Sequence, residues 1–174
     1  MNHEIKCLLI LRVKKLSIVD PQSGEVTPVE VYVAVLGHCK YTYVEAISSQ
    51  RKEDSIQATE NALHYYVGVP KVLVPDNLNS AVTKASRYEA NINSTFLDFA
   101  NHYGTTVIPA RSYKPRDKAL VEKAVSIAYS RIFAPMRDEV FTSLSSFNIA
   151  IKDILVLHNN KSFTSRPHSS KQLF

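Results

Sequence analysis

Residues spaced as in β-strands dominate the first part of the chain. Residues 29–36 (VEVYVAVL) and 41–47 (YTYVEAI) are rich in β-branched and aromatic side chains. Residues 7–19 begin with an apolar cluster and end at an Asp-Pro turn formed by residues 20–25. Because short turns join the three segments, the pattern predicts an antiparallel meander of three strands.

The apolar spacing then becomes helical, and a helix–glycine–strand order occurs twice. Each glycine is expected to end its helix in the left-handed conformation. In chain order the segments are a helix at 52–67 with Gly68, a strand at 71–74, a helix at 94–103 with Gly104, and a strand at 105–109. Such alternation argues for parallel strands added to the meander.

Two longer helical patterns follow, one at 117–137 that breaks near Pro135 and one at 144–157. Together these elements predict an α/β fold with a mixed five-stranded sheet, three antiparallel strands and then two parallel ones, flanked by helices. We assign residues 7–160 to this single domain. Residues 161–174 are expected to form a polar C-terminal tail that is extended or disordered.

The composition is that of a globular protein, expected in the cytoplasm. No apolar run approaches the ~20 residues that a membrane span needs, and Cys7 and Cys39 lack metal-ligand spacing. The charge is uneven. Residues 111–174 hold 11 Lys or Arg against 5 Asp or Glu, whereas residues 1–110 hold 10 against 11. A basic segment suits a polyanion such as DNA, although a solvated basic face explains the charge equally well.

Two carboxylates are placed as metal ligands. Asp76 follows a buried strand, and Glu122 lies near the start of a long helix. A strand-end Asp and a helix-borne Glu can converge on a divalent cation, as metal-assisted phosphodiester chemistry requires. Taken alone, a strand-end Asp such as Asp76 is more often a helix cap or turn residue, and a Glu in the second turn of a helix is usually a surface residue favoured by the helix dipole. Nearby polar and basic side chains are candidate DNA contacts, namely Asn77, Arg111, Lys114, Arg116 and Lys118.

Six short stretches closely resemble the catalytic core of IstA-type transposases, which belong to bacterial insertion sequences that also encode an ATPase partner. They are residues 31–37 (VYVAVLG), 41–46 (YTYVEA), 60–66 (ENALHYY), 74–78 (VPDNL), 102–106 (HYGTT) and 116–122 (RDKALVE). The resemblance implies a ribonuclease H-like fold. It also implies DNA strand transfer by a DDE triad, two Asp and one Glu that hold two Mg²⁺ (or Mn²⁺) ions. The implied partners are DNA, further copies of the chain and the ATPase.

Carried over residue by residue, the resemblance makes Asp76 the second Asp and Glu122 the Glu of the triad. Both would therefore be catalytic and metal-binding. The first Asp is missing, because aligning residues 14–16 with the family's Lys-Lys-Leu-like continuation puts Ile10 in its place. An isoleucine cannot bind a metal, so we expect an under-liganded site and catalysis lowered by orders of magnitude.

The genetic code offers an origin for Ile10. Residues 6–15 can be encoded so that reading from the third base gives Val-Phe-Ile-Asp-Phe-Ala-Gly-Lys-Lys, the motif expected of the family. We infer a one-base shift near Lys14 and Lys15, with residues 1–13 outside the ancestral frame. No other acid is expected to replace the lost Asp, because Asp20 should start a turn and Glu30 and Glu45 should face solvent.

Three functions remain open at this point. The chain could be a transposase catalytic core, or a noncatalytic remnant that binds DNA or a full-length transposase. A receiver-like signalling domain with Asp76 as phosphoacceptor is the third, but it lacks an acidic pair at an earlier strand end and a Lys at a later one. The helix-turn-helix region that family members use to recognise DNA termini is expected to be missing.

Overall fold

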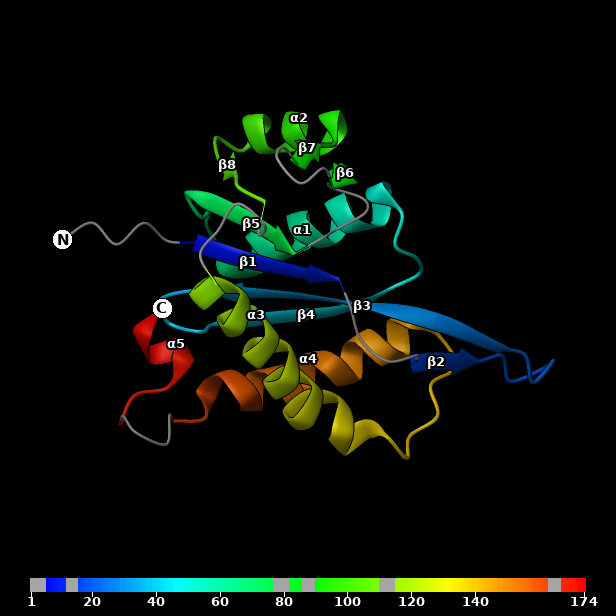
Figure 1. Ribbon diagram of the computed structural model, residues 1–174. Coiled ribbons are helices and arrows are strands. Elements are labelled where there is room, and N and C mark those ends of the chain that lie inside the picture. The colour runs from blue at the N-terminus through cyan, green and yellow to red at the C-terminus, as the bar shows by residue number, and fades with distance from the viewer. Residues whose placement is uncertain (1–5, 12–15, 77–81, 86–89, 110–114, 163–166) are drawn as a thin grey trace.

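A computed structural model describes residues 6–11, 16–76, 82–85, 90–109, 115–162 and 167–174 (Figure 1). Its strands are β1 (Lys6–Leu11), β2 (Leu16–Val19), β3 (Val26–Leu36), β4 (Thr42–Ile47), β5 (Val72–Asp76), β6 (Val82–Ala85), β7 (Ala90–Ile92) and β8 (Thr106–Val107). The helices are α1 (Lys52–Tyr66), α2 (Ser94–His102), α3 (Pro115–Ala128), α4 (Leu144–Asn160) and α5 (Ser170–Leu173). Between α3 and α4 lie a π-helical turn, η2 (Tyr129–Phe133), and a 3-10 turn, η3 (Ala134–Met136).

The main sheet has the order β4–β3–β1–β5–β8. The strands β4, β3 and β1 pair antiparallel, whereas β1, β5 and β8 pair parallel. The predicted mixed sheet, with three antiparallel and then two parallel strands, is therefore confirmed. The hairpin of β6 and β7 was not expected from the sequence.

The strand expected at residues 7–19 is divided into β1 and β2, and both pair with the long β3. Leu11 lies opposite Tyr32, and Leu16 lies opposite Val29. The two partners are five residues apart in the first segment but only three residues apart in β3. The pairing register therefore shifts between β1 and β2. The main sheet has six strands, whereas the sequence pattern predicted one strand in place of these two.

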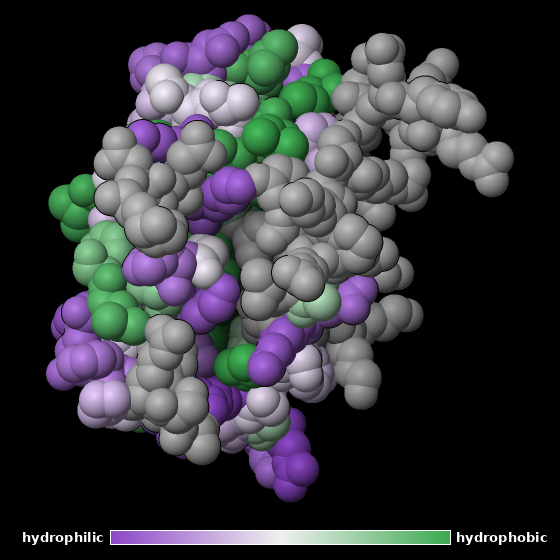
Figure 2. All heavy atoms as spheres, turned by 60° about the vertical axis from the view of Figure 1, so that its left-hand side comes forward, coloured by the Kyte–Doolittle hydropathy of each residue, from purple (hydrophilic) through white to green (hydrophobic). Residues whose placement is uncertain are grey.

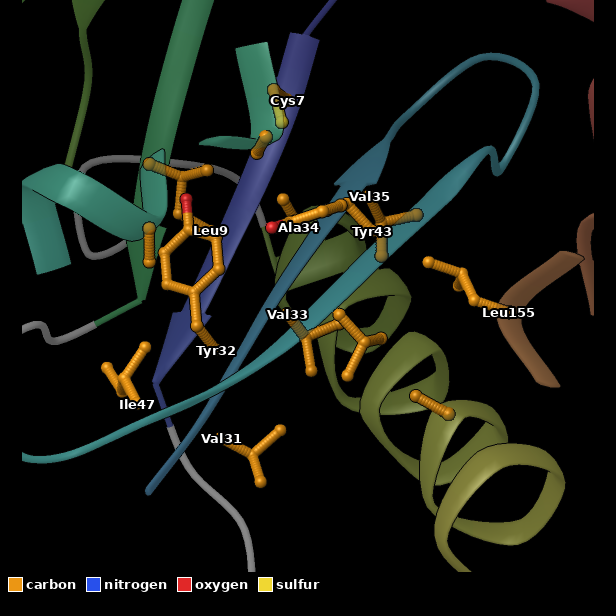
Figure 3. Close-up of a cluster of buried hydrophobic side chains, with 14 of the residues drawn as sticks. Cys7, Leu9, Val31, Tyr32, Val33, Ala34, Val35, Tyr43, Ile47 and Leu155 are labelled. Atoms are coloured by element: carbon orange, nitrogen blue, oxygen red, sulfur yellow. The ribbon is translucent and has the colours of Figure 1, made fainter. Parts of the chain in front are cut away.

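The centre of the molecule is β3, which is buried on both faces from Val31 to Leu36. Figure 3 shows Tyr32 and Val33 leaving β3 on opposite sides, Tyr32 toward Leu9 of β1 and Val33 toward α3. On the Tyr32 side lies α1, since the Tyr32 hydroxyl donates to Thr59 of that helix at 3.0 Å. On the other side α3 packs over β3 and β1 (Figure 1). Helices therefore cover both faces of the sheet centre, as an α/β domain requires.

The two predicted glycine caps have different outcomes. Gly104 has φ +66° just after α2, so the expected left-handed glycine is confirmed there. At the end of α1 the left-handed residue is Val67, with φ +50°, and the prediction for Gly68 is wrong. The reason lies in the core. The buried Tyr66 donates its hydroxyl to the Ala34 carbonyl at 2.8 Å, which fixes the last helical turn and leaves the reversal to the next residue.

The helix predicted at 117–137 breaks as expected, although its regular part ends earlier. It becomes π-helical at Tyr129 and 3-10 helical around Pro135. Proline has no N–H to donate to the Arg131 carbonyl four residues earlier, so the α-helical ladder cannot continue through it. In the following α4 the predicted apolar side is confirmed, because Phe147, Ile151 and Leu155 are buried.

The C-terminal segment corrects an expectation. Residues 167–174 are not extended or disordered, because they include α5, which begins at a capping box between Ser169 and Gln172. The Phe174 ring stacks on Tyr41 with a centroid distance of 4.7 Å. Reciprocal capping and aromatic packing are enough to order a short polar segment against the domain.

Exposed hydrophobic residues lie in separate groups on the face of the molecule that Figure 2 shows. Hydrophilic residues lie between these groups. On α4 the exposed aliphatic residues are Ile149, Val156 and Leu157. Scattered apolar residues of this kind are normal on soluble domains. Among the described helices, none has the length and apolar character to cross a membrane.

Candidate metal and DNA site

The first candidate ligand, Asp76, is the last residue of β5. Its register partner on the adjacent parallel strand β1 is Ile10. The two residues therefore lie level with each other at the carboxyl ends of neighbouring strands. Ligand sites in α/β folds gather at such ends, where side chains from several strands and the following loops meet.

The second candidate, Glu122, is exposed in the second turn of α3. Proline at the first helical position, Pro115, suits a helix start because its missing N–H would have no intrahelical partner there. α3 packs against β1 and β3, so the helix that carries Glu122 contacts the strand that carries Ile10. Asp76, Ile10 and Glu122 thus belong to three elements, and β1 contacts the other two.

The predicted DNA-contact residues are only partly placed. Asn77, Arg111 and Lys114 lie outside the described residues. For Arg116 and Lys118 the structure describes helical backbone in the first turn of α3 and no side chain. The structure does not describe the side chain of Asp76 either. The site is therefore defined by the register of Asp76 with Ile10 and by the position of Glu122 on α3.

The other acidic residues have roles of their own. Asp20 starts a turn as predicted, because its Oδ1 accepts the N–H groups of Gln22 and Ser23 at 2.8 Å each. These hydrogen bonds lower the pKa of the Asp20 carboxyl. Asp20 therefore stabilises the turn that follows β2 and has a local structural role.

Glu45 departs from the expectation that it faces solvent. It is half-buried between β4 and α1, where its carboxylate accepts hydrogen bonds from Asn61 and from the Tyr43 hydroxyl at 2.9–3.1 Å. The sequence pattern could not reveal this because Asn61 lies 16 residues away, on another element. Glu30 is also half-buried, opposite Ile47.

The buried position of Cys7 disfavours its reactive thiolate form. Burial raises the pKa of the Cys7 thiol to about 12, so it carries no thiolate at neutral pH. Within the described ranges no three His, Cys, Asp or Glu side chains gather as metal ligands.

Comparison with solved structures places the fold. The catalytic core domain of BIV integrase matches with a TM-score of 0.66, covering 98% of this chain and 93% of that one at 15% identity. The HTLV-2 integrase catalytic core domain, solved in complex with magnesium in a dimeric form, matches with a TM-score of 0.66 over 97% and 94% at 15% identity. The chain thus has the fold of these integrase catalytic cores, and the expected ribonuclease H-like α/β fold is confirmed.

Sequence comparison gives the closer relationship. A transposase of Sinorhizobium fredii is 41% identical over 157 residues, which are 90% of this chain and 30% of that protein. A transposase of insertion sequence IS408 from Burkholderia multivorans is 38% identical over 144 residues, 83% of this chain and 28% of that protein. A transposase of insertion sequence IS21 from Pseudomonas aeruginosa is 29% identical over 115 residues, 66% of this chain and 30% of that protein.

The chain is therefore homologous to insertion-sequence transposases, as the resemblance in its motifs predicted. It spans about a third or less of the length of these curated relatives: 30%, 28% and 30%. No protein-family model matches it.

Proposed function

We propose that the chain is the catalytic-core segment of an insertion-sequence transposase, with a metal site that has lost its first carboxylate. The register between Ile10 and Asp76 carries this proposal. A residue of β1 that lies level with Asp76 of β5 is well placed to share a metal ion with Asp76 and Glu122. The resemblance to IstA-type transposases implies an Asp at this position. Ile10 supplies no donor atom, so Asp76 and Glu122 remain.

The two carboxylates suit Mg²⁺ or Mn²⁺, because hard divalent cations prefer oxygen ligands and retain several waters. When bound, a pair of such ions activates the attacking hydroxyl and stabilises the leaving oxygen in phosphodiester transfer. Asp76 and Glu122 would hold and orient the cation. With the third carboxylate missing, one metal position is under-liganded, and we propose a strand-transfer rate lowered by orders of magnitude.

The same replacement favours a second candidate function. A chain that folds as a transposase core without a complete metal site could bind DNA or a full-length transposase and interfere with it. Three partners follow from the transposase assignment: DNA, further copies of the chain, and the ATPase of the insertion sequence. The basic C-terminal part of the chain, with 11 Lys or Arg against 5 Asp or Glu in residues 111–174, supports the first of these.

Replacing residue 10 tests the metal site. We expect Ile10→Asp to bind Mn²⁺ more tightly than the wild-type chain in a calorimetric titration and to melt at a higher temperature when Mg²⁺ is added. Ile10→Asn is the matched control, since it is also polar and nearly the same size as Asp but brings no charge. A third variant, Ile10→Asp with Asp76→Asn, should lose the gain. Plasmid nicking in Mn²⁺ should rise only in Ile10→Asp.

Two results would contradict the proposal. If Ile10→Asp and Ile10→Asn respond alike to metal, residue 10 is not at the site. If the wild-type chain nicks DNA as fast as Ile10→Asp, and Asp76→Asn abolishes that activity, the site is complete without a carboxylate at residue 10.

A further inference from the structure

The outward side of α4 carries two aliphatic residues with a pair of opposite charges between them. Ile149 and Val156 are 60% and 51% exposed. Lys152 and Asp153, which lie between them in the helix, are exposed as well. Residues three, four and seven positions apart share one side of a helix, so the four side chains form a single outward stripe. Single exposed apolar residues are normal on a protein surface, but this stripe combines apolar and charged residues in a fixed order.

The spacing of the outward stripe is the same from either end. Lys152 and Asp153 are adjacent at its middle. Ile149 lies three residues before Lys152, and Val156 lies three residues after Asp153. An exposed polar residue stands four positions further out at each end, namely Ser145 and Asn160. In chain order the stripe is therefore polar, apolar, basic, acidic, apolar and polar.

The two charges of the stripe are not paired within the part of the chain that the structure describes. The ion pair found there joins Arg137 and Asp138. Lys152 and Asp153 are consecutive residues, which do not face each other on a helix. On α4 no charged residue stands three or four positions from either of them. An opposite charge for each can therefore come from another molecule.

A second copy of the chain supplies both opposite charges at once. In a two-fold pair of antiparallel helices that cross at the middle of the stripe, residues equally far from the crossing point lie opposite each other. Lys152 then meets the partner's Asp153, and Ile149 meets the partner's Val156. Symmetry forms each of these contacts twice. A different protein could fit the same helix, but its binding would not require a stripe that is symmetric about its middle.

We propose that the outward stripe of α4 is a self-association surface on which the α4 helix of a second copy packs antiparallel. The partner is one of the further copies in the proposed function, so this inference rests on that function and adds the surface. DNA suits the stripe less well, because the stripe carries an acid and two aliphatic side chains. One helix from each copy buries less than the roughly 800 Å² per partner of a standard interface, so the dimer is expected to be weak.

Charge reversal in the full chain tests the pairing. Lys152→Asp makes the middle of the stripe wholly acidic, and Asp153→Lys makes it wholly basic. In sedimentation equilibrium at high protein concentration, each variant alone should dimerise roughly tenfold more weakly than the wild-type chain, because both charge pairs become repulsive. An equal mixture of the two variants should form mixed dimers with wild-type affinity, since opposite charges then meet again.

Matched controls make the same changes elsewhere. Arg137→Asp and Asp138→Lys alter the net charge equally at an exposed ion pair outside the stripe. Alone or mixed, they should associate like the wild-type chain. Ile149→Lys should weaken dimerisation, whereas Val67→Lys, which places a lysine at an exposed aliphatic position after α1, should not. All of these positions are exposed, so the melting temperatures should change little.

Three results would overturn the surface. The first is a wild-type chain that stays monomeric at every concentration. The second is a wild-type dimer whose affinity Lys152→Asp and Ile149→Lys leave unchanged, in which case further copies remain a partner through another surface. The third is a control mixture that gains as much affinity as the stripe mixture, because net charge is then responsible. The response of Ile10→Asp to metal is measured separately, so the proposed metal site is tested independently of the dimer.

Discussion

Asn159 of α4 forms hydrogen bonds with both backbone polar groups of Thr42 in β4. Its Oδ1 accepts the Thr42 N–H at 3.0 Å, and its Nδ2 donates to the Thr42 carbonyl at 2.7 Å. Asn148 does the same for Ala46, at 2.7 and 2.9 Å. Because β4 is the edge strand beside β3, these two amides occupy positions where another strand would pair. A helix thereby closes one edge of the sheet.

Removing the Asn159 amide should destabilise the fold. Asn159→Ala leaves the N–H and the carbonyl of the buried Thr42 without partners. Unsatisfied buried groups cost about 1–3 kcal/mol each, so we expect the free energy of unfolding to fall by about 2–4 kcal/mol. Urea denaturation measures it. The neighbouring exposed residue provides the control, because Asn160→Ala should change stability by less than about 0.5 kcal/mol. Equal effects of the two substitutions would show that the hydrogen bonds between Asn159 and Thr42 do not contribute to the free energy of unfolding.

Replacing Val67 should stabilise the fold. Val67 is a β-branched residue with φ +50°, and its side chain is 89% exposed, so it gains little from packing. The left-handed conformation costs a residue with a Cβ about 1–2 kcal/mol, which glycine avoids at some entropic cost. We expect Val67→Gly to raise the free energy of unfolding by about 1 kcal/mol. Val69→Gly, at a position without positive φ, should be neutral or destabilising.

His158 should make stability depend on pH. Its pKa is about 4 in the folded chain and 6.5 ordinarily, mainly because burial disfavours the charged ring. Between these values the unfolded chain binds a proton that the folded chain does not, so lowering the pH from 6.5 to 4 reduces the free energy of unfolding. For a partly exposed ring we expect about 1–2 kcal/mol.

Denaturation at several pH values measures this effect. The contribution of His158 is complete above pH 6.5 and lost as the pH falls toward 4. His158→Gln should therefore flatten the curve in that interval. A wild-type curve with the same slope as His158→Gln would contradict the shifted pKa.

The codons for residues 6–15 test the proposed frame change. We expect the gene to give Val-Phe-Ile-Asp-Phe-Ala-Gly when this stretch is read from the third base of the Lys6 codon. Codons that cannot produce an Asp in another frame near Ile10 would exclude that origin. Determining the nucleotide sequence over β1 settles the point.

Much of the fold was predictable because periodicity reports burial. The central strand β3 and the helix α4 were located closely by their apolar spacing, since a chain segment buried on one or both faces must place apolar residues at that spacing. Cys7 and Leu9 of β1 are buried for the same reason. An apolar run is sufficient for a central strand, so the proposed loss of the first Asp would not remove the strand.

Other features could not be predicted because they depend on partners far away in the chain. Glu45 was expected in solvent but meets Asn61, and the cap of α1 fell on Val67 because Tyr66 is anchored to β3. The tail was expected to be extended or disordered, yet its last residue, Phe174, stacks on Tyr41. Each of these contacts joins residues of different elements that lie far apart in the sequence. No local sequence pattern indicates that such residues will meet.

By itself the sequence determined the order of elements, the acidic candidates Asp76 and Glu122, and the apolar residue at position 10, because residue type and spacing are local properties. Only the tertiary structure decided that Ile10 lies level with Asp76 and that α3 contacts β1, since register and helix packing arise when strands distant in the chain share hydrogen bonds and a common core.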